Sequence, residues 1–248
     1  MHIISFIFIF FIIHTPVAFS QSGCPRNIAD VRNNGKYHQT DEVIYSTADR
    51  LCSYEHANGN LMHEIPVKDG KMDGISKSYY ESGMLKSESP YKDNKKEGTT
   101  KNYYESGKLQ SEYPHKDNKI EGIVNFYYVS GKLHSEYPNK NDKLEGIVNF
   151  YYESGKLQSE YLHKNGIREG SSKNYNEDGS LSQETTYNNG KKDGPMKSYR
   201  NNGKLFATFV YKADYPLSGE CHHQDGRRTP LTNAELTNWE NGLSVTCE

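Results

Sequence analysis

Glycine recurs every 24 residues in two columns that run through most of the chain, and this spacing restricts the fold to a repeat architecture. The first column has seven members: Gly59, Gly83, Gly107, Gly131, Gly155, Gly179 and Gly203. The second column has six: Gly74, Gly98, Gly122, Gly146, Gly170 and Gly194. A period of this length indicates that one small supersecondary unit stacks on copies of itself.

Each unit repeats the same residue types at the same places. Leucine stands two residues after each glycine of the first column, from Leu61 to Leu205, and tyrosine stands four residues before six of them, from Tyr79 to Tyr199. Glutamate recurs in a further column from Glu64 to Glu184. Tyr, Ile, Val, Phe and Thr dominate these segments, and helical i, i+3, i+4 spacing is absent from them. Each unit is therefore predicted to be a hairpin of two strands.

The turn residues predict how the strands pair. One turn contains Glu-Ser-Gly or a similar triplet, and the other ends at residues that tolerate a left-handed backbone: Gly70, Asn94, Asn118, Asp142, Gly166 and Gly190. We interpret both connections as three-residue loops, each a type I turn closed by a left-handed residue. Such loops pair residues of the same parity.

Parity then predicts the two faces of the sheet. The odd-numbered face is expected to be the packed one, and it would hold the Leu column, the Tyr79 column, Ile75, Ile123, Ile147, Tyr113, Tyr137 and Tyr161. The even-numbered face would hold the Glu88 column, Tyr80, Tyr104, Tyr128, Tyr152, Pro90, Pro114 and Pro138.

Composition favours a thin structure. The chain is only 33% hydrophobic, has a mean hydropathy of −0.92 and contains 20 tyrosines, which is too polar for a thick core and too rich in tyrosine for disorder. We therefore predict an all-β fold, an elongated single-layer antiparallel β-meander of stacked hairpins with disulfide-pinned ends and one short C-terminal helix. A net charge of −2 gives no electrostatic signal for nucleic-acid binding.

The ends of the chain differ from its centre. Residues 1–20 have the apolar run and the small-x-small site of a secretory signal peptide, with an uncleaved anchor or a lipoprotein attached through Cys24 as alternatives. We expect an N-terminal cap at 21–52, the repeat array at 53–212 and a C-terminal cap at 213–248. The four cysteines favour two local disulfides, Cys24–Cys52 and Cys221–Cys247. Thr232 and Glu235 form a capping box that predicts a short helix through Trp239.

Residue patterns for catalysis or cofactor binding are weak. Cys221, His222 and His223 lack a second pair at metal-ligand spacing. The Glu column supplies similar carboxylates, whereas glycoside hydrolysis needs two in different environments. The serines that precede glycine, such as Ser106, are turn residues without a partnered histidine. We predict a protein that is not an enzyme and has no cofactor or metal.

The unit Tyr-Tyr-Glu-Ser-Gly-Lys-Leu-x-Ser-Glu-Tyr, followed by Lys-x-Glu-Gly, resembles the variant MORN repeat of bacterial proteins, some of which are labelled antitoxin-like. The resemblance covers roughly residues 53–212. It implies antiparallel hairpins stacked into an elongated twisted sheet, and interaction or scaffolding instead of catalysis.

Together these features predict an exported scaffold at the bacterial envelope, either periplasmic, extracellular or on the outer surface. We expect it to bind a protein or extended peptide along a tyrosine-lined sheet, and no nucleic acid. An antitoxin or immunity-type protein and an envelope lipid or glycan binder are the alternatives. The candidate binding surface consists of Tyr80, Tyr104, Tyr128, Tyr152, Phe126 and Phe150.

Overall fold

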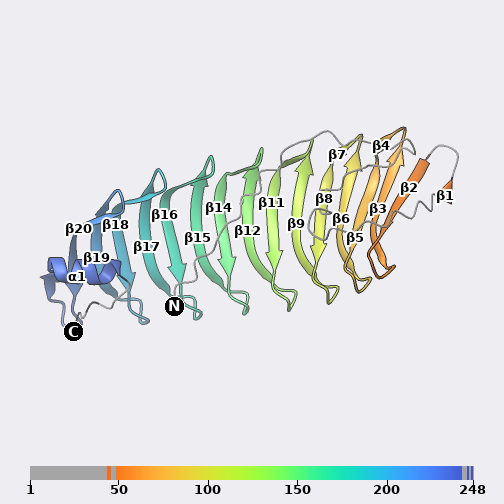
Figure 1. The fold of residues 1–248 in the computed structure, drawn as a ribbon. Coiled ribbons are helices and arrows are strands. Elements are labelled where there is room, and N and C mark those ends of the chain that lie inside the picture. The colour runs from red at the N-terminus through yellow and green to blue at the C-terminus, as the bar shows by residue number, and fades with distance from the viewer. Residues whose placement is uncertain (1–43, 46–48, 242–244, 246, 248) are drawn as a thin grey trace.

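The described part of the protein is one long, twisted antiparallel sheet with a single helix at its C-terminal end (Figure 1). The computed structural model describes residues 44–45, 49–241, 245 and 247. The predicted signal peptide at 1–20 and Cys24, with its predicted bond to Cys52, lie outside the described residues. In the described part, 21 strands form one sheet. The predicted all-β, single-layer array of hairpins is confirmed.

The strands follow one another across the sheet in chain order. Their bounds are β1 Ile44–Tyr45, β2 Asp49–Glu55, β3 Leu61–Lys68, β4 Lys71–Met72, β5 Gly74–Tyr79, β6 Leu85–Lys92, β7 Lys95–Lys96, β8 Gly98–Tyr103, β9 Leu109–Lys116, β10 Lys119–Ile120, β11 Gly122–Tyr127, β12 Leu133–Lys140, β13 Lys143–Leu144, β14 Gly146–Tyr151, β15 Leu157–Lys164, β16 Ile167–Tyr175, β17 Leu181–Asn188, β18 Lys191–Tyr199, β19 Leu205–Lys212, β20 Tyr215–His222 and β21 Arg228–Pro230.

The connections correct the predicted loop lengths. At the first turn the prediction holds, because the backbone N–H of Tyr128 bonds the Lys132 carbonyl across three residues. At the second turn Lys140 pairs with Lys143, so only two residues lie between the strands. Both of these, Asn141 and Asp142, have positive φ angles of 49° and 64°. The second connection is therefore a two-residue turn with both central residues left-handed, as in type I′.

This difference, together with a bulge, changes which residues share a face. Phe126 pairs with Ser135 but Tyr127 pairs with Leu133, so His134 is an extra residue between the two pairs. Residues of opposite parity are consequently paired along most of each hairpin, as Val124 with Tyr137. The predicted odd and even faces are wrong for part of their members.

We name the two observed faces by their characteristic residues. The Glu face carries the Tyr79 and Leu85 columns, the Glu88 column, the prolines of the Pro90 column, Ile75, Ile123 and Ile147. The Phe face carries Val124, Val148, Phe126 and Phe150 together with Tyr113, Tyr137 and Tyr161. Val124 and Val148 are 3% and 2% exposed, so the Phe face is the packed one. The Leu column is only half-buried on the other face.

Proline explains why four of the first strands are interrupted. One column of the repeat holds Pro66, Pro90, Pro114 and Pro138. The strand that follows each of these prolines is divided by one acidic residue into a two-residue strand and a six-residue strand, as in β4 and β5. Leu162 and Thr186 take the same place in later repeats, and there the first strands β16 and β18 are continuous. Proline has no N–H to donate to the neighbouring strand, whereas leucine and threonine have one.

Hydrogen bonds tie each repeat to the next. The Tyr103 hydroxyl donates to a Glu88 carboxylate oxygen at 2.7 Å, and equivalent bonds link four other pairs: Tyr79–Glu64, Tyr127–Glu112, Tyr151–Glu136 and Tyr175–Glu160. The acidic residue before the second glycine bonds the following turn, as the Glu121 carboxylate accepts from the Asn141 N–H at 2.8 Å. The Tyr and Glu columns therefore hold neighbouring hairpins together.

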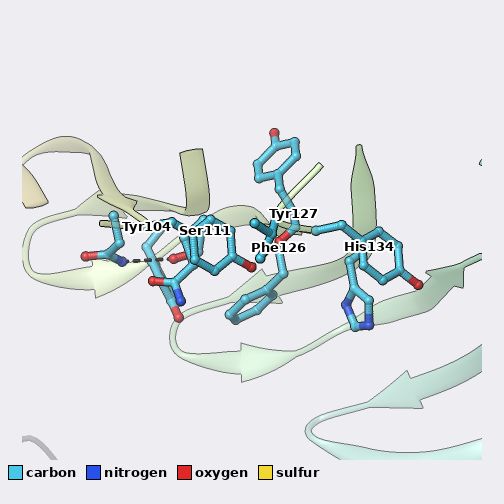
Figure 2. Close-up of a pocket in the computed structure, with 10 residues that line it drawn as sticks. Tyr104, Ser111, Phe126, Tyr127 and His134 are labelled. Carbon is cyan, nitrogen blue, oxygen red and sulfur yellow. Dashed lines mark hydrogen bonds between the residues drawn. The ribbon is translucent and has the colours of Figure 1, made fainter. Parts of the chain in front are cut away.

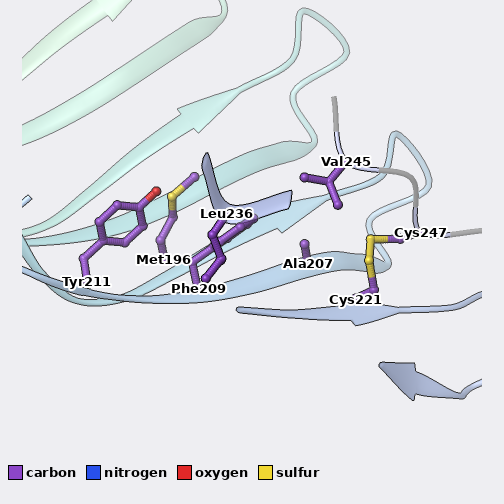
Figure 3. Close-up of a cluster of buried hydrophobic side chains, with 8 residues drawn as sticks. All are labelled: Met196, Ala207, Phe209, Tyr211, Cys221, Leu236, Val245 and Cys247. Carbon is purple, nitrogen blue, oxygen red and sulfur yellow. A yellow bond between two sulfur atoms is a disulfide. The ribbon is translucent and has the colours of Figure 1, made fainter. Parts of the chain in front are cut away.

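The C-terminal end is closed by the predicted helix, α1 Asn233–Glu240, on the Phe face (Figure 3). Thr232 caps it, and the capping box with Glu235 is present. The Trp239 ring stacks on Phe209 with a centroid distance of 4.6 Å, and Cys221 is bonded to Cys247 as predicted. Gly219 leaves room for this cap, because a Cβ there would lie 2.7 Å from Leu231 and 3.0 Å from Leu236.

Candidate binding surface

Aromatic rings of the central repeats form a continuous row on the Phe face. Tyr113, Phe126, Tyr137, Phe150 and Tyr161 contact one another in that order, edge to face, with centroid distances of 5.7, 5.5, 5.6 and 5.8 Å. Edge-to-face contacts are a favoured arrangement for aromatic pairs. We call these five residues the aromatic row. The guanidinium of Arg168 lies over the last ring, 4.1 Å from its centroid.

A groove with a volume of about 540 Å³ opens beside the aromatic row (Figure 2). It is lined by residues of the hairpin β8–β9, its turn, and the strand β11 that follows, together with His134 of the next bulge. The lining residues are Asn102, Tyr104, Gln110, Ser111, Tyr113, Phe126, Tyr127, Tyr128, Val129 and His134. The rings of Phe126 and Tyr127 point to opposite sides of the strand in Figure 2, so Phe126 serves the Phe face.

The six residues predicted as a binding surface have different positions. Tyr104, Phe126 and Tyr128 line the groove, and Phe150 continues the aromatic row beyond it. Tyr80 and Tyr152 stand at the same turn position in other repeats. All four tyrosine hydroxyls donate to a backbone carbonyl of the next repeat, at 2.7, 2.6, 2.7 and 2.7 Å for Tyr80, Tyr104, Tyr128 and Tyr152. Their hydroxyls are therefore occupied by contacts within the chain.

Seven of the ten lining residues were not predicted as a binding surface, and two of these, Val129 and His134, differ from the residues at the same place in the adjacent repeats. Val129 stands where Glu81, Glu105 and Glu153 stand in other repeats, and it is 59% exposed. His134 stands where Gln110 and Gln158 stand, and it is the extra residue of the bulge. Its ring packs edge to face on Tyr128 at 4.7 Å. The sequence signal was visible for Val129, which departs from a column of glutamates, but not for His134, whose position also holds Lys86, Ser182 and Phe206 in other repeats.

The groove carries no formal charge. Its lining residues include no Asp, Glu, Lys or Arg. Burial lowers the pKa of the His134 imidazole, which favours the neutral ring. Nδ1 of His134 lies 2.9 Å from the Ser135 hydroxyl, and the Asn102 amide donates to Ser111 at 2.9 Å. In the described part of the chain, neither the Gln110 amide nor Nε2 of His134 has a hydrogen-bond partner, so both are available to a ligand.

Within residues 44–45, 49–241, 245 and 247, no three His, Cys, Asp or Glu side chains are grouped closely enough to hold a metal ion. Over the same residues, no helix has the length and apolar character that crossing a membrane requires.

The fold and the groove define a hairpin-repeat scaffold. Five segments match the family model of the MORN repeat variant, at residues 72–93, 96–117, 144–165, 168–189 and 192–213. The family model thus finds the MORN repeat variant in five repeats, in agreement with the resemblance. The matches pass over residues 120–141, the repeat that contains Val129 and His134. No curated protein sequence matches the chain.

Solved structures give only distant matches. The chain aligns with the crystal structure of TcdB2-TccC3-Cdc42 at 14% identity and a TM-score of 0.22, covering 73% of this chain and 12% of that one. It aligns with a porin-like protein from Bacteroides uniformis ATCC 8492 at 12% identity and a TM-score of 0.20, covering 76% and 91%. We draw nothing about fold or function from similarities at these TM-scores.

Proposed function

We propose that this protein is an exported, non-catalytic repeat scaffold at the bacterial envelope that binds a protein or an extended peptide on the Phe face. The groove beside the aromatic row is the observation that carries the proposal. An extended segment lying along the row would place apolar side chains on Tyr104, Phe126 and Tyr128 and main-chain groups near Gln110 and His134. Peptide-binding domains commonly combine aromatic-lined grooves with a few polar groups in this way.

The departure of one repeat from the common pattern supports a binding role. A purely structural repeat needs only the columns that contact its neighbours, and Val129 and His134 are replaced by Glu and Gln in repeats that form the same hairpin. The exposed Val129 therefore has no evident part in the stacking, whereas the His134 ring contacts Tyr128 at 4.7 Å and Phe150 of the next repeat at 6.0 Å. Val129 and His134 are the residues we expect to contact the ligand.

The charge of the groove favours a neutral peptide segment over an anionic lipid headgroup. A site for phosphate or carboxylate groups is built from Arg, Lys or protonated His, and none of these lines the groove. The Cys221–Cys247 bond supports export, since disulfides persist in oxidising compartments and are rare in the cytosol.

A displayed library of random extended peptides, selected against residues 21–248, tests this proposal. We expect peptides that bind one per chain, and the double variant Val129→Glu/His134→Gln should weaken them by about tenfold or more. These substitutions restore residues already present in neighbouring repeats, so folding should be unchanged. Ile167→Glu is the matched control, because Ile167 is 45% exposed and lies outside the groove.

Equal affinity of the double variant and the wild-type chain would place binding elsewhere and contradict the proposal. Selection of no peptide, combined with binding to a glycan array or to lipid vesicles, would support the lipid or glycan alternative instead.

A further inference from the structure

The Glu face carries an exposed apolar row that no described element covers. One residue from each long strand between β3 and β15 belongs to this row. In strand order these residues are Pro66, Ile75, Pro90, Thr99, Pro114, Ile123, Pro138, Ile147 and Leu162. We call this the proline–isoleucine row. Ile75, Ile123 and Ile147 are 53%, 50% and 49% exposed. Large apolar side chains that are exposed in a continuous row commonly mark an interaction surface.

A row of charged and amide side chains runs beside it on the same face, two residues further along each strand. Register pairs each member with the next: Glu64, Lys77, Glu88, Lys101, Glu112, Asn125, Glu136, Asn149, Glu160, Lys173, Glu184 and Lys197. Glutamate occupies every other strand, and Lys or Asn occupies the strands between. We call this the alternating row.

Two lysines of the alternating row, Lys101 and Lys197, make only long ion pairs within one chain, whereas Lys173 lies 3.2 Å from Glu160. Lys101 and Lys197 lie 3.9 and 3.8 Å from Glu88 and Glu184, and their side chains are 42% and 46% exposed. At such exposure these contacts contribute little to stability. The ammonium groups are available to a carboxylate on another molecule.

We propose that the Glu face is the interface of a homodimer in which two copies of this chain pack sheet against sheet. The two-fold axis would run parallel to the strands, between the two sheets and midway between β11 and β12. It would reverse the order of the strands in the facing copy, and each row of one copy would lie opposite the same row of the other. Glu136 would then face Asn125, Glu112 would face Asn149, and Lys101 would face Glu160. Every glutamate meets an amide or an ammonium group, because Glu alternates with Lys or Asn.

This self-complementarity selects a second copy as the occupant. The same rotation places the proline–isoleucine row on itself, with Ile123 opposite Pro138 and Ile147 opposite Pro114, so the apolar surface of both copies is buried. An isologous two-fold contact requires such a self-complementary patch. Aligned sheets cross at about −30°, so we expect contact over the central strands β8 to β15 only.

The size of this central region suits a dimer. The region is six strands wide, with a spacing of about 4.8 Å between strands, and about seven residues long, with a rise of about 3.4 Å per residue. These dimensions give a patch of roughly 650–700 Å² on each copy. Stable interfaces bury about 800 Å² on each partner. The Phe face lies on the other side of the sheet, so dimerisation through the Glu face leaves the proposed peptide groove open.

Sedimentation equilibrium of residues 21–248 tests the dimer. We expect the wild-type chain to be dimeric, and Asn125→Lys/Asn149→Lys to tighten the dimer, because both new lysines would face Glu136 or Glu112. Asn125→Glu/Asn149→Glu should raise the dissociation constant by about tenfold or more, since like charges facing each other cost several kcal/mol. Lysine stands at the equivalent position in four other repeats and is tolerated there.

Two further variants separate dimerisation from folding. Ile123→Thr/Ile147→Thr introduces the residue found at Thr99 and should weaken the dimer, whereas Ile167→Glu, off both rows, should not. Circular dichroism checks that each variant is folded. A wild-type chain that stays monomeric at about 100 µM, or folded Lys and Glu variants with the same dissociation constant, would overturn the proposal.

Discussion

The hydroxyl of Tyr127 donates a 2.8 Å hydrogen bond to the carboxylate of Glu112, which belongs to the preceding hairpin. The two residues lie on adjacent strands, β11 and β9, whose register brings Asn125 opposite Glu112. The same bond recurs from Tyr79 to Tyr175, so the interface between neighbouring repeats is nearly constant along the array. An array of this kind derives its stability from contacts between nearest neighbours.

Replacing Tyr127 with phenylalanine removes this bond without changing the ring. We expect the free energy of unfolding to fall by about 1 kcal/mol, because a half-buried carboxylate loses its donor. Tyr199→Phe is the matched control, since no hydrogen bond joins Tyr199 to Glu184 in the described part of the chain. Urea unfolding measures the change in the free energy of unfolding for both variants. An equal loss for the two variants would show that the bond contributes nothing specific.

The tyrosine column also predicts how stability depends on alkaline pH. Burial and the hydrogen bond to Glu raise the pKa of Tyr79, Tyr103, Tyr127 and Tyr151 to about 12. In the unfolded chain tyrosine titrates near pH 10, so between pH 10 and 12 the unfolded state holds fewer protons than the folded state. Stability from these residues is full below pH 10 and is lost as the pH rises through 12. Residue-resolved NMR of the tyrosine rings should therefore show these four phenolates forming together with unfolding, and phenolates of these four residues that form below pH 10 in the folded chain would contradict this.

The second glycine column is predicted to be required by packing as well as by backbone conformation. Gly122 has a φ of 120°, and a Cβ there would lie 3.1 Å from Cγ of Pro114. Gly122→Ala should cost about 1–3 kcal/mol from backbone strain, plus a contact term. Gly131→Ala is the comparison, because Gly131 also has a positive φ but nothing lies within 4 Å of its Cβ position.

Thermal or urea denaturation should show the larger loss for Gly122→Ala. Pro114→Ala in the same chain should reduce the difference between the two glycine variants, since it removes the atom that the new methyl group meets. A Gly131→Ala variant that is as unstable as Gly122→Ala would assign the whole effect to backbone strain.

The C-terminal disulfide is expected to stabilise the cap more than the array. Cys221 and Cys247 are 26 residues apart, and closing a loop of this length contributes about 3 kcal/mol in the chain-entropy model. In the double variant Cys221→Ser/Cys247→Ser, hydrogen exchange should accelerate in α1 and β20 while β9 to β14 stay protected. Uniform acceleration along the sheet would show that the cap and the array unfold together.

Much of this fold can be predicted from the sequence because the repeats average out local ambiguity. The glycine columns give the period, the capping box at Thr232 gives α1, and the left-handed turn residues are observed with positive φ, as at Asn118 with 67°. Each of these signals is local and has a single backbone solution.

The assignment of faces failed because it depends on counting residues between strands. Asp or Asn followed by Gly or Asn suits a two-residue type I′ turn, and the structure uses that turn with left-handed residues at both positions. The bulge at His134 then adds one residue to the second strand. A bulge has no sequence signature in this repeat, and a one-residue change moves side chains to the opposite face.

Part of the candidate site could be predicted in the same way. Tyr104, Phe126 and Tyr128 follow from the aromatic content of the columns, and all three line the groove. Val129 did not emerge from the shared pattern because it is an exception to it, and comparing the repeats column by column would have identified it. His134 stands at a position that varies from repeat to repeat, so only the bulge and the ring contacts in the structure identify it.

Deleting residues 122–145 tests the repeat account most directly. This removes 24 residues and joins Glu121 to Gly146, which preserves the register because the segments that start at Gly122 and Gly146 both read Gly-Ile-Val-Asn-Phe-Tyr-Tyr. We predict a folded protein with cooperative unfolding whose maximum dimension in small-angle scattering is shorter by about 10 Å, the width of two strands. Deleting residues 122–144 should fail to fold, because 23 residues shift every downstream side chain to the wrong face. Loss of cooperative folding in the 24-residue deletion, with folding retained in the 23-residue one, would contradict the account.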